Sequence, residues 1–241
     1  MRYPSQIKKI LYSLQDKSRC KRKRIFLNQF SLHKDIKILD LGGWDGKYIA
    51  NILEDQDVLC KNVYIADIDH KAVFKAQEQY GFKAIHLCEH ETLPFPNDFF
   101  DIVFCSSVIE HVTFPKKDIW KIRSGEQFRK VAMQKQHQFA SEIRRIGKNY
   151  FIQTPYRWFP FETHVQLPFV NYLPRSYALG LIKWTNRYWI KKTQPDWNLL
   201  SKSNLGELFP DGKFFQEKFL FLTKSLIIVK NNYPGCLTSS Q

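Results

Sequence analysis

The sequence predicts an α/β fold in which a mostly parallel sheet is covered by helices on both faces. Short apolar runs that end at Gly or Asp alternate with stretches of helical composition over most of the chain. The 241 residues suffice for one large domain with a substantial core, so no disulfide or metal has to hold it together. A composition that is 44% hydrophobic and 25% charged excludes a disordered or collagen-like protein.

The elements follow in order from the hydrophobic pattern. The stretch 47–53 has apolar residues on one helical face, and 71–80 is a second helix that Asp69 can cap and Gly81 ends. A basic helical segment precedes the fifth strand, and two apolar segments near the end of the chain form an antiparallel pair. The predicted strands are 37–41, 62–66, 83–87, 101–106, 149–153, 214–221 and 224–230.

Charge and aromatic content divide the chain into a basic N-terminal arm or helix, 1–30, and a single domain, 31–241. Of the net charge of +14, residues 1–24 carry 9 basic residues and 1 acidic residue, and residues 113–149 carry 10 and 3. The stretch of about 154–210 does not alternate between strand and helix and holds four of the six Trp. We expect it to be an aromatic-rich cap inserted over the edge of the sheet.

The basic arm allows more than one interpretation. Six basic residues within 17–24 can contact nucleic acid phosphates or anionic lipid head groups, which makes peripheral membrane contact conceivable. The alternative is a solvated extension that aids solubility. The arm alone does not indicate a nucleic-acid-binding protein.

Cysteine use and hydropathy indicate a cytoplasmic protein. The five Cys are odd in number and form no C-x-x-C pair, which disfavours a secreted disulfide framework, and no metal site is expected. The longest run without Asp, Glu, Lys or Arg, 163–174, has 12 residues and two prolines, which is too short for a transmembrane helix. No signal peptide is predicted. The sequence does not indicate an oligomeric state.

Two signals at strand ends indicate a ligand site. The run 39–46 (LDLGGWDG) closes a strand with Asp40 and opens a Gly-containing turn that lets a ligand approach the backbone. Asp67 follows the next strand, where an acid can accept hydrogen bonds from both ribose hydroxyls. The G-x-G-x-x-G spacing is absent, which disfavours a nicotinamide oxidoreductase.

A third signal is Leu93-Pro94-Phe95, then Phe100-Asp101 leading into a strand, then Glu110-His111 after it. Together the three signals resemble the class I methyltransferases that use S-adenosylmethionine, in particular the group that acts on small molecules. The resemblance runs from about residue 36 to 112 and resumes at 142–147 and 224–229. It implies a Rossmann-like sheet of seven strands with one antiparallel strand near the edge, and S-adenosylmethionine as cofactor.

The resemblance also implies roles for single residues. Asp67 would hold the ribose hydroxyls, Ile68 would pack on the adenine, and Ser106 would lie beside the reactive sulfonium. The pair Glu89-His90 falls where the family has an acid near the adenine amino group. The methionine half would be lined by the turn of the first motif, that is by Asp40, Gly42, Gly43, Trp44 and Gly46.

Trp44 departs from the family pattern, because the family has its central glycine at this position. A bulky side chain there predicts a narrower cofactor site or a shifted turn. Gly43 beside it can restore backbone freedom.

The segment after the fifth strand, 153–164 (QTPYRWFPFETH), should face the methyl acceptor. His164 has the chemistry to remove a proton from an acceptor hydroxyl near neutral pH, and Glu162 can orient it or act instead. His111 is a further catalytic candidate. For both histidines a purely structural role is the alternative. Methyl transfer needs mainly alignment of the reacting groups, so the absence of a catalytic triad does not exclude it.

The leading hypothesis is therefore methyl transfer to a small-molecule, saccharide or lipid-linked acceptor, at oxygen. The aromatic side chains of the cap favour an acceptor with apolar or ring surface. One alternative is an RNA methyltransferase that uses the basic arm, although 105–107 (CSS) lacks the Asn/Asp-Pro-Pro-aromatic motif of enzymes that methylate base amino groups. The other is a non-catalytic binding protein whose cofactor site Trp44 has closed.

Overall fold

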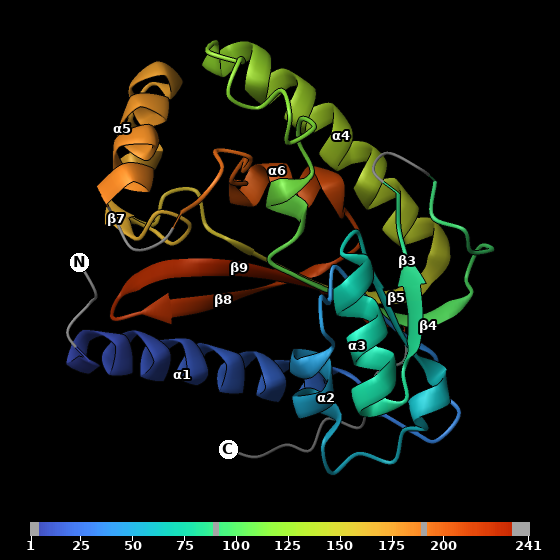
Figure 1. Ribbon diagram of the computed structural model, residues 1–241. Coiled ribbons are helices and arrows are strands. Elements are labelled where there is room, and N and C mark those ends of the chain that lie inside the picture. The colour runs from blue at the N-terminus through green and yellow to red at the C-terminus, as the bar shows by residue number, and fades with distance from the viewer. Residues whose placement is uncertain (1–4, 89–91, 189–191, 233–241) are drawn as a thin grey trace.

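The computed structural model describes residues 5–88, 92–188 and 192–232, with the backbone alone for 5–15. Its centre is a seven-stranded sheet in the order β3-β2-β1-β4-β5-β9-β8 (Figure 1). Neighbours from β3 to β5 are parallel, and β9 is antiparallel to both β5 and β8. The predicted sheet, with its one antiparallel strand next to the edge, is confirmed. The strands are β1 Ile38–Leu41, β2 Val63–Asp67, β3 Lys83–His86, β4 Phe100–Ser106, β5 Gly147–Pro155, β8 Lys213–Phe219 and β9 Leu222–Lys230.

Helices cover both faces of this sheet, as the sequence predicts. The helices α1, α2 and α3 bury one apolar cluster, in which Phe26, Ile49 and Val73 pack against strand residues such as Phe104. The other face packs against α4 and α6. Because β1, β4 and β5 are buried on both sides, they read as continuous apolar runs. The helices are α1 Ser5–Gln29, α2 Lys47–Leu53, α3 His70–Tyr80, α4 Gly125–Ile146, α5 Arg175–Tyr188 and α6 Lys202–Leu208.

The ends of α3 and α4 have local causes. The side chain of Asp69 accepts a hydrogen bond from the Ala72 amide at 3.0 Å and so caps α3, which ends at Gly81 with φ of 69°. The hydroxyl of Ser124 accepts from the Gln127 amide and caps α4. The predicted cap and stop of α3 are confirmed.

The second half of α1 belongs to the folded body of the protein. Phe26 is fully buried, with its ring edge-on to Phe104 and Phe151 at 5.5 Å between centroids. The guanidinium of Arg22 forms an ion pair with Glu217 of β8 at 3.0 Å. The interpretation of residues 1–24 as a solvated extension is therefore wrong for Arg22, although Lys17 and Arg19 are exposed. A domain boundary near residue 30 stays a prediction.

The predicted cap contains two short strands, β6 Phe161–Glu162 and β7 Leu167–Pro168, the 3-10 turn η3 Val170–Tyr172, and α5. It has a small apolar cluster of its own around Val165, Val170 and Ile182. The last part of the predicted stretch is different, because Leu205 and Leu208 of α6 are buried in the main core. Within the described residues, no helix combines the length and the apolar character needed to cross a membrane.

Candidate functional site

The carboxyl ends of β2, β1 and β4 lie side by side, and the turn 42–46 runs across them (Figure 1). The amide of Gly42 donates to the carbonyl of Ala66 at 2.7 Å. The amide of Trp44 donates to the carboxylate of Asp67 at 3.0 Å. These two bonds fix the turn against the end of β2, as expected if both signals belong to one site.

The two adjacent glycines allow close packing under this turn. Gly42 has φ of 75°, and a Cβ there would lie 2.3 Å from Cγ2 of Val108. A Cβ on Gly43 would lie 2.4 Å from a carboxylate oxygen of Asp40. Any side chain at either position would displace its neighbour. The contact with Val108 also ties the turn to the loop that carries Glu110.

Trp44 takes the family's glycine position through its backbone. Its φ of 49° lies in the left-handed region that favours glycine, and its side chain is 61% exposed. The indole is therefore not packed into the space between the ends of β1 and β2. The exposure of Trp44 therefore gives no support to the narrower cofactor site that the bulk of its side chain predicts.

Asp40 is a buried acid beneath this turn. Burial, with a smaller contribution from the charge of Asp67, raises the pKa of its carboxyl group to about 8. No hydrogen-bond partner for it is found within the part of the chain that the structure describes. A buried carboxyl group in this state is suited to receive a cationic ligand group.

Asp67 keeps acceptor capacity for a ligand. Each of its carboxylate oxygens accepts one backbone N–H, from Trp44 and from Asp69. A carboxylate oxygen has a second lone pair, so two hydroxyl groups can still be bound. Ile68 follows it and is 46% exposed, so an apolar surface is available there. The predicted residues Glu89 and His90 lie outside the described residues.

Ser106, at the end of β4, belongs to a buried polar network. Its hydroxyl donates to Oε1 of Gln153 at 2.7 Å and accepts from Nη1 of Arg22 at 3.1 Å. Arg22 also donates to Gln153 at 3.0 Å and is paired with Glu217. The chain thus places a guanidinium from α1 beside the predicted position of the reactive group.

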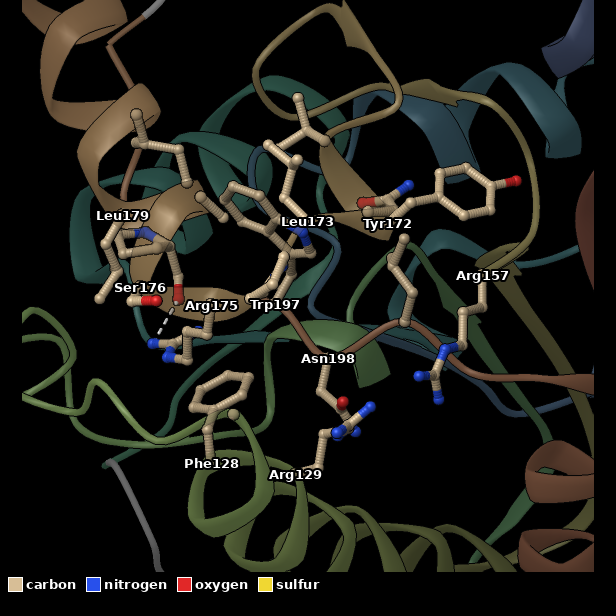
Figure 2. Close-up of a pocket in the computed structure, with 18 of the residues that line it drawn as sticks. Phe128, Arg129, Arg157, Tyr172, Leu173, Arg175, Ser176, Leu179, Trp197 and Asn198 are labelled. Atoms are coloured by element: carbon tan, nitrogen blue, oxygen red, sulfur yellow. Dashed lines mark hydrogen bonds between the residues drawn. The ribbon is translucent and has the colours of Figure 1, made fainter.

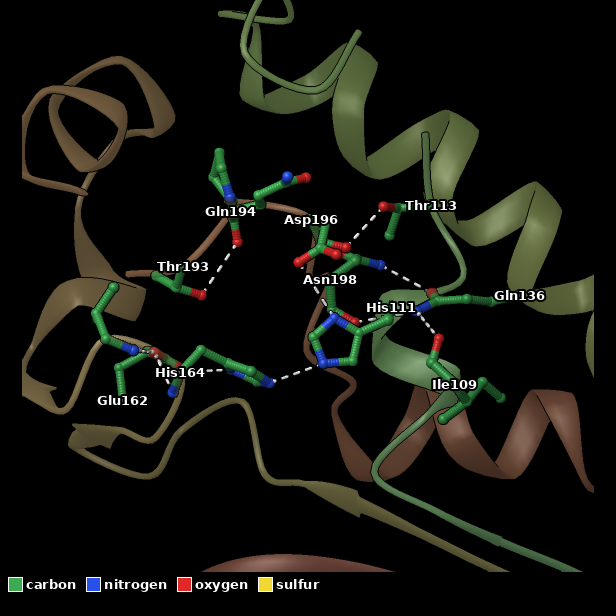
Figure 3. A network of polar contacts seen from close by, with 12 residues as sticks. Ile109, His111, Thr113, Gln136, Glu162, His164, Thr193, Gln194, Asp196 and Asn198 are labelled. Carbon is green, nitrogen blue, oxygen red and sulfur yellow. Dashed lines mark hydrogen bonds and ion pairs between the residues drawn. The ribbon is translucent and has the colours of Figure 1, made fainter. Parts of the chain in front are cut away.

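The three predicted catalytic residues lie together in a second cluster (Figure 3). The two imidazoles are perpendicular, and their Nε2 atoms are 3.1 Å apart. Nδ1 of His164 is 2.6 Å from a carboxylate oxygen of Glu162, and Nδ1 of His111 is 3.2 Å from one of Asp196. Although burial alone lowers the pKa of His111, its bond to Asp196 and the nearby acids raise it overall. Glu162 therefore orients His164, as one of the predicted alternatives states.

The rest of the cluster is supplied by Glu110 and Trp197. Glu110 lies in the 3-10 turn η2 Ile109–His111 and is fully buried. Its Oε2 accepts from the hydroxyl of Thr154 at 3.0 Å, and its Oε1 has no hydrogen-bond partner among the residues that the structure describes. The ring of Trp197 is stacked on His164 at 4.8 Å between centroids. His164 thus makes a packing contact with Trp197 and polar contacts with Glu162 and His111.

A pocket of about 630 Å³ opens beside this cluster and shares Trp197 with it (Figure 2). Aromatic rings, among them Phe128, and four arginines line it. The guanidinium of Arg175 lies 3.6 Å above the ring of Phe128 and donates to backbone carbonyl oxygens. It therefore fixes the segments that form this side of the pocket. Arg129 and Arg157 are in no ion pair with any described residue. Burial, and then the charge of Arg129, lower the pKa of Arg157.

Several residues of these clusters are not recognisable from the sequence. Asp196 is 85 residues from His111, in the cap, and no local pattern marks it. Arg22 is one of six basic residues in a run, and its ion-pair partner is 195 residues away. Glu110 belongs to the Glu110-His111 pair that follows the fourth predicted strand, and its position directly before a candidate histidine was the available signal.

Comparison with known proteins agrees with this arrangement. Residues 39–123 match a family model described as a methyltransferase domain. The match begins in β1 and ends shortly before α4, so it includes Asp40, the turn 42–46, Asp67 and Ser106. No sequence among the curated proteins matches this chain.

Solved structures support the fold. A protein from Pyrococcus horikoshii is similar with a TM-score of 0.54 and 18% identity, over 88% of this chain and 89% of that one. Magnesium protoporphyrin IX methyltransferase from Synechocystis, with bound SAH, is similar with a TM-score of 0.50 and 13% identity, over 96% and 90% of the two chains. A chain of the complex between the Haloferax volcanii Trm112 methyltransferase activator and a methyltransferase gives a TM-score of 0.50, with 12% identity over 89% and 93%.

Proposed function

We propose that this chain, whose residues 39–123 match a methyltransferase domain, uses S-adenosylmethionine to methylate an oxygen atom of a small acceptor with an apolar or ring body and an anionic group. Saccharide and lipid-linked acceptors fall within this class. The observation that carries the proposal is a pocket with aromatic walls and two neighbouring arginines, Arg129 and Arg157, that form no ion pair with a described residue. This pocket adjoins a pair of oriented histidines.

The residues around the turn 42–46 fit the cofactor. A buried, unpartnered carboxyl group at Asp40 suits the positive charge of the methionine half, and the free lone pairs of Asp67 suit two ribose hydroxyls. We propose that Gly42, Gly43, Trp44 and Gly46 line the site with their backbone. We further propose that Ile68 packs beside the adenine and that Ser106 lies beside the sulfonium. When bound, S-adenosylmethionine supplies a methyl group already activated by its positively charged sulfur.

The pocket supports the nature of the acceptor. Phe128, Tyr172 and Trp197 offer ring faces, which bind apolar or planar groups. Arg129 and Arg157 are close enough to repel each other, and the lining holds one described acid, Glu126. A carboxylate or phosphate on the acceptor would relieve this repulsion and bind two charged donors.

The histidine cluster supports oxygen as the accepting atom. A hydroxyl group attacks carbon well only when its proton leaves, and nearby imidazoles assist this step. We propose that His111 and His164 prepare the hydroxyl, with Glu162 and Asp196 holding the two rings. The trapping of Arg22 in an internal ion pair argues against an arm reserved for RNA.

The test is a screen of cell extracts with methyl-labelled donor, followed by mass spectrometry and NMR of the labelled product. We expect a product that is heavier than the acceptor by one CH₂ group. Its new methyl group should be on oxygen, and it should carry an anionic group elsewhere. A label found only in RNA or on nitrogen would refute the proposal.

A variant sharpens this test. We expect Arg157→Met to raise the KM for the anionic acceptor by about tenfold or more, because a charge-assisted hydrogen bond contributes roughly 1.5–3 kcal/mol. The matched control is Arg187→Met, which removes an exposed arginine of α5 that does not line the pocket. Equal KM values in the two variants would contradict the assignment of Arg157.

A further inference from the structure

Three potential metal ligands meet at one point beside the acceptor pocket, namely Glu110, His111 and His164 (Figure 3). One ligand atom from each lies within 4.8 Å of the other two. They come from η2 and from the loop after β6, so the fold and not a local motif assembles them. No metal site was predicted from the sequence.

The hydrogen bonds of the two imidazoles create a conflict that a cation would resolve. Nδ1 of His111 faces Asp196 and Nδ1 of His164 faces Glu162, and carboxylates accept hydrogen bonds but do not donate them when ionised. Each ring nitrogen Nδ1 therefore carries the proton. The two Nε2 atoms then present lone pairs to each other across 3.1 Å. A proton on one ring or a metal cation between the two rings resolves this contact, and the remaining contacts distinguish the two.

The pairing of each imidazole with a carboxylate is also typical of histidines that bind metal ions. Histidines that bind a metal almost always donate their other N–H to a carboxylate or carbonyl, which fixes the ring. Here both histidines have such a carboxylate, and His164 is further held by stacking on Trp197. The amides of His164 and Val165 in turn donate to the carboxylate of Glu162.

Glu110 is an independent observation that indicates a ligand. Its side chain is fully buried, and the hydroxyl of Thr154 satisfies Oε2 alone. Within the described part of the chain, Oε1 has no hydrogen-bond partner. A buried carboxylate oxygen without a partner is costly, and coordination to a cation removes that cost.

We propose that Glu110, His111 and His164 bind one divalent first-row transition metal ion, with Asp196 and Glu162 as the groups that orient the histidines. Metal–nitrogen bonds of about 2.0–2.1 Å place two ligand nitrogens about 2.9–3.4 Å apart in octahedral or tetrahedral geometry. The observed 3.1 Å between the Nε2 atoms falls in this range. Two imidazoles and one carboxylate suit Zn²⁺, Co²⁺ or Fe²⁺, whereas Mg²⁺ and Ca²⁺ take oxygen ligands.

Resting on the proposed function, the site explains how the two histidines prepare the acceptor hydroxyl, which is by holding the metal ion and not by accepting the proton themselves. Three protein ligands leave a position open for the acceptor oxygen, whose O–H pKa a cation lowers. The proton leaves to solvent. The oxygen then forms its bond to the methyl carbon as the carbon–sulfur bond breaks, and the sulfur keeps that electron pair and becomes neutral.

Metal binding can be measured without any acceptor. The full chain is stripped with a chelator and titrated with Zn²⁺, Co²⁺ and Mg²⁺ by calorimetry, with visible absorption followed for Co²⁺. We expect one Zn²⁺ or Co²⁺ per chain with sub-micromolar Kd and no comparable binding of Mg²⁺. Glu110→Gln and His164→Gln should each weaken Zn²⁺ binding at least a hundredfold. Asp196→Asn should weaken it about 10–100-fold, the usual effect of removing a group that orients a metal-binding histidine.

The control is His137→Gln, which removes an exposed histidine of α4 and should bind Zn²⁺ as the unaltered chain does. Binding of S-adenosylhomocysteine by the variants verifies that they are folded. The proposal is overturned if the unaltered chain binds no transition metal, or if Glu110→Gln and His164→Gln bind it as tightly as His137→Gln. Tight binding without any methylated product would leave the metal site standing and refute the proposed function instead.

Discussion

The buried carboxyl group of Asp40 makes the stability of the protein depend on pH. In the folded protein its pKa is raised from 3.8 to about 8, first by burial and then by Asp67. The unfolded chain releases this proton near pH 4, and the folded protein keeps it until about pH 8. Between these values the folded state binds more protons, so the stability is fully present below pH 4 and falls as pH rises.

The magnitude follows from the shift. One pKa unit corresponds to about 1.4 kcal/mol, so about four units give a loss of roughly 5–6 kcal/mol between pH 4 and pH 8. Asp40→Asn cannot ionise and has nearly the same shape. We therefore expect the difference in free energy of unfolding between the variant and the unaltered chain to grow by about 1.4 kcal/mol per pH unit over this window, in favour of the variant.

The assay is urea unfolding of cofactor-free protein at pH 5, 6, 7 and 8, followed by tryptophan fluorescence. Asp45→Asn is the matched control, because Asp45 lies in the same turn but is paired with Lys75. We expect this control to follow the pH dependence of the unaltered chain. If the difference between Asp40→Asn and the unaltered chain does not change with pH, the reasoning about the buried carboxyl group is refuted.

Three further changes test the packing around the site. Phe26→Ala should lower the free energy of unfolding by about 3–5 kcal/mol, because the ring is fully buried, and an unchanged urea midpoint would contradict this. Arg22→Met should cost about 3–5 kcal/mol by leaving Glu217 buried without its cation, and adding Glu217→Met should restore most of the loss in the same assay. Gly43→Ala should weaken calorimetric binding of S-adenosylhomocysteine at least tenfold, because its Cβ would lie 2.4 Å from the carboxyl group of Asp40, and unaltered affinity would show that the turn can adapt.

The sheet could be predicted from the sequence because its signals are local. Each central strand is a short apolar run, and the cap at Asp69 and the stop at Gly81 are set by neighbouring residues. The turn 42–46 and Asp67 were found for the same reason, since each follows directly on a strand. The clusters that involve distant segments were not. Asp196 and Arg22 owe their roles to partners 85 and 195 residues away, and a composition or spacing pattern carries no trace of such pairs.

The histidine cluster was found only in part. His164 and His111 were singled out for their chemistry, and Glu162 for its position two residues before His164. That the two rings face each other depends on the loop geometry after β6 and on η2. The buried, half-satisfied state of Glu110 could not be predicted, because burial of a carboxylate depends on the packing of the whole cap.

The packing of Arg22 and Phe26 of α1 against the sheet has a consequence for biosynthesis. Glu217, which receives the Arg22 guanidinium, leaves the ribosome 195 residues later than its partner. Phe26 can pack once Phe104 and Phe151 have been synthesised, but until Glu217 follows the Arg22 guanidinium has no ion-pair partner. The nascent chain must therefore wait for β8 and β9 before the sheet and its contact with Arg22 are complete.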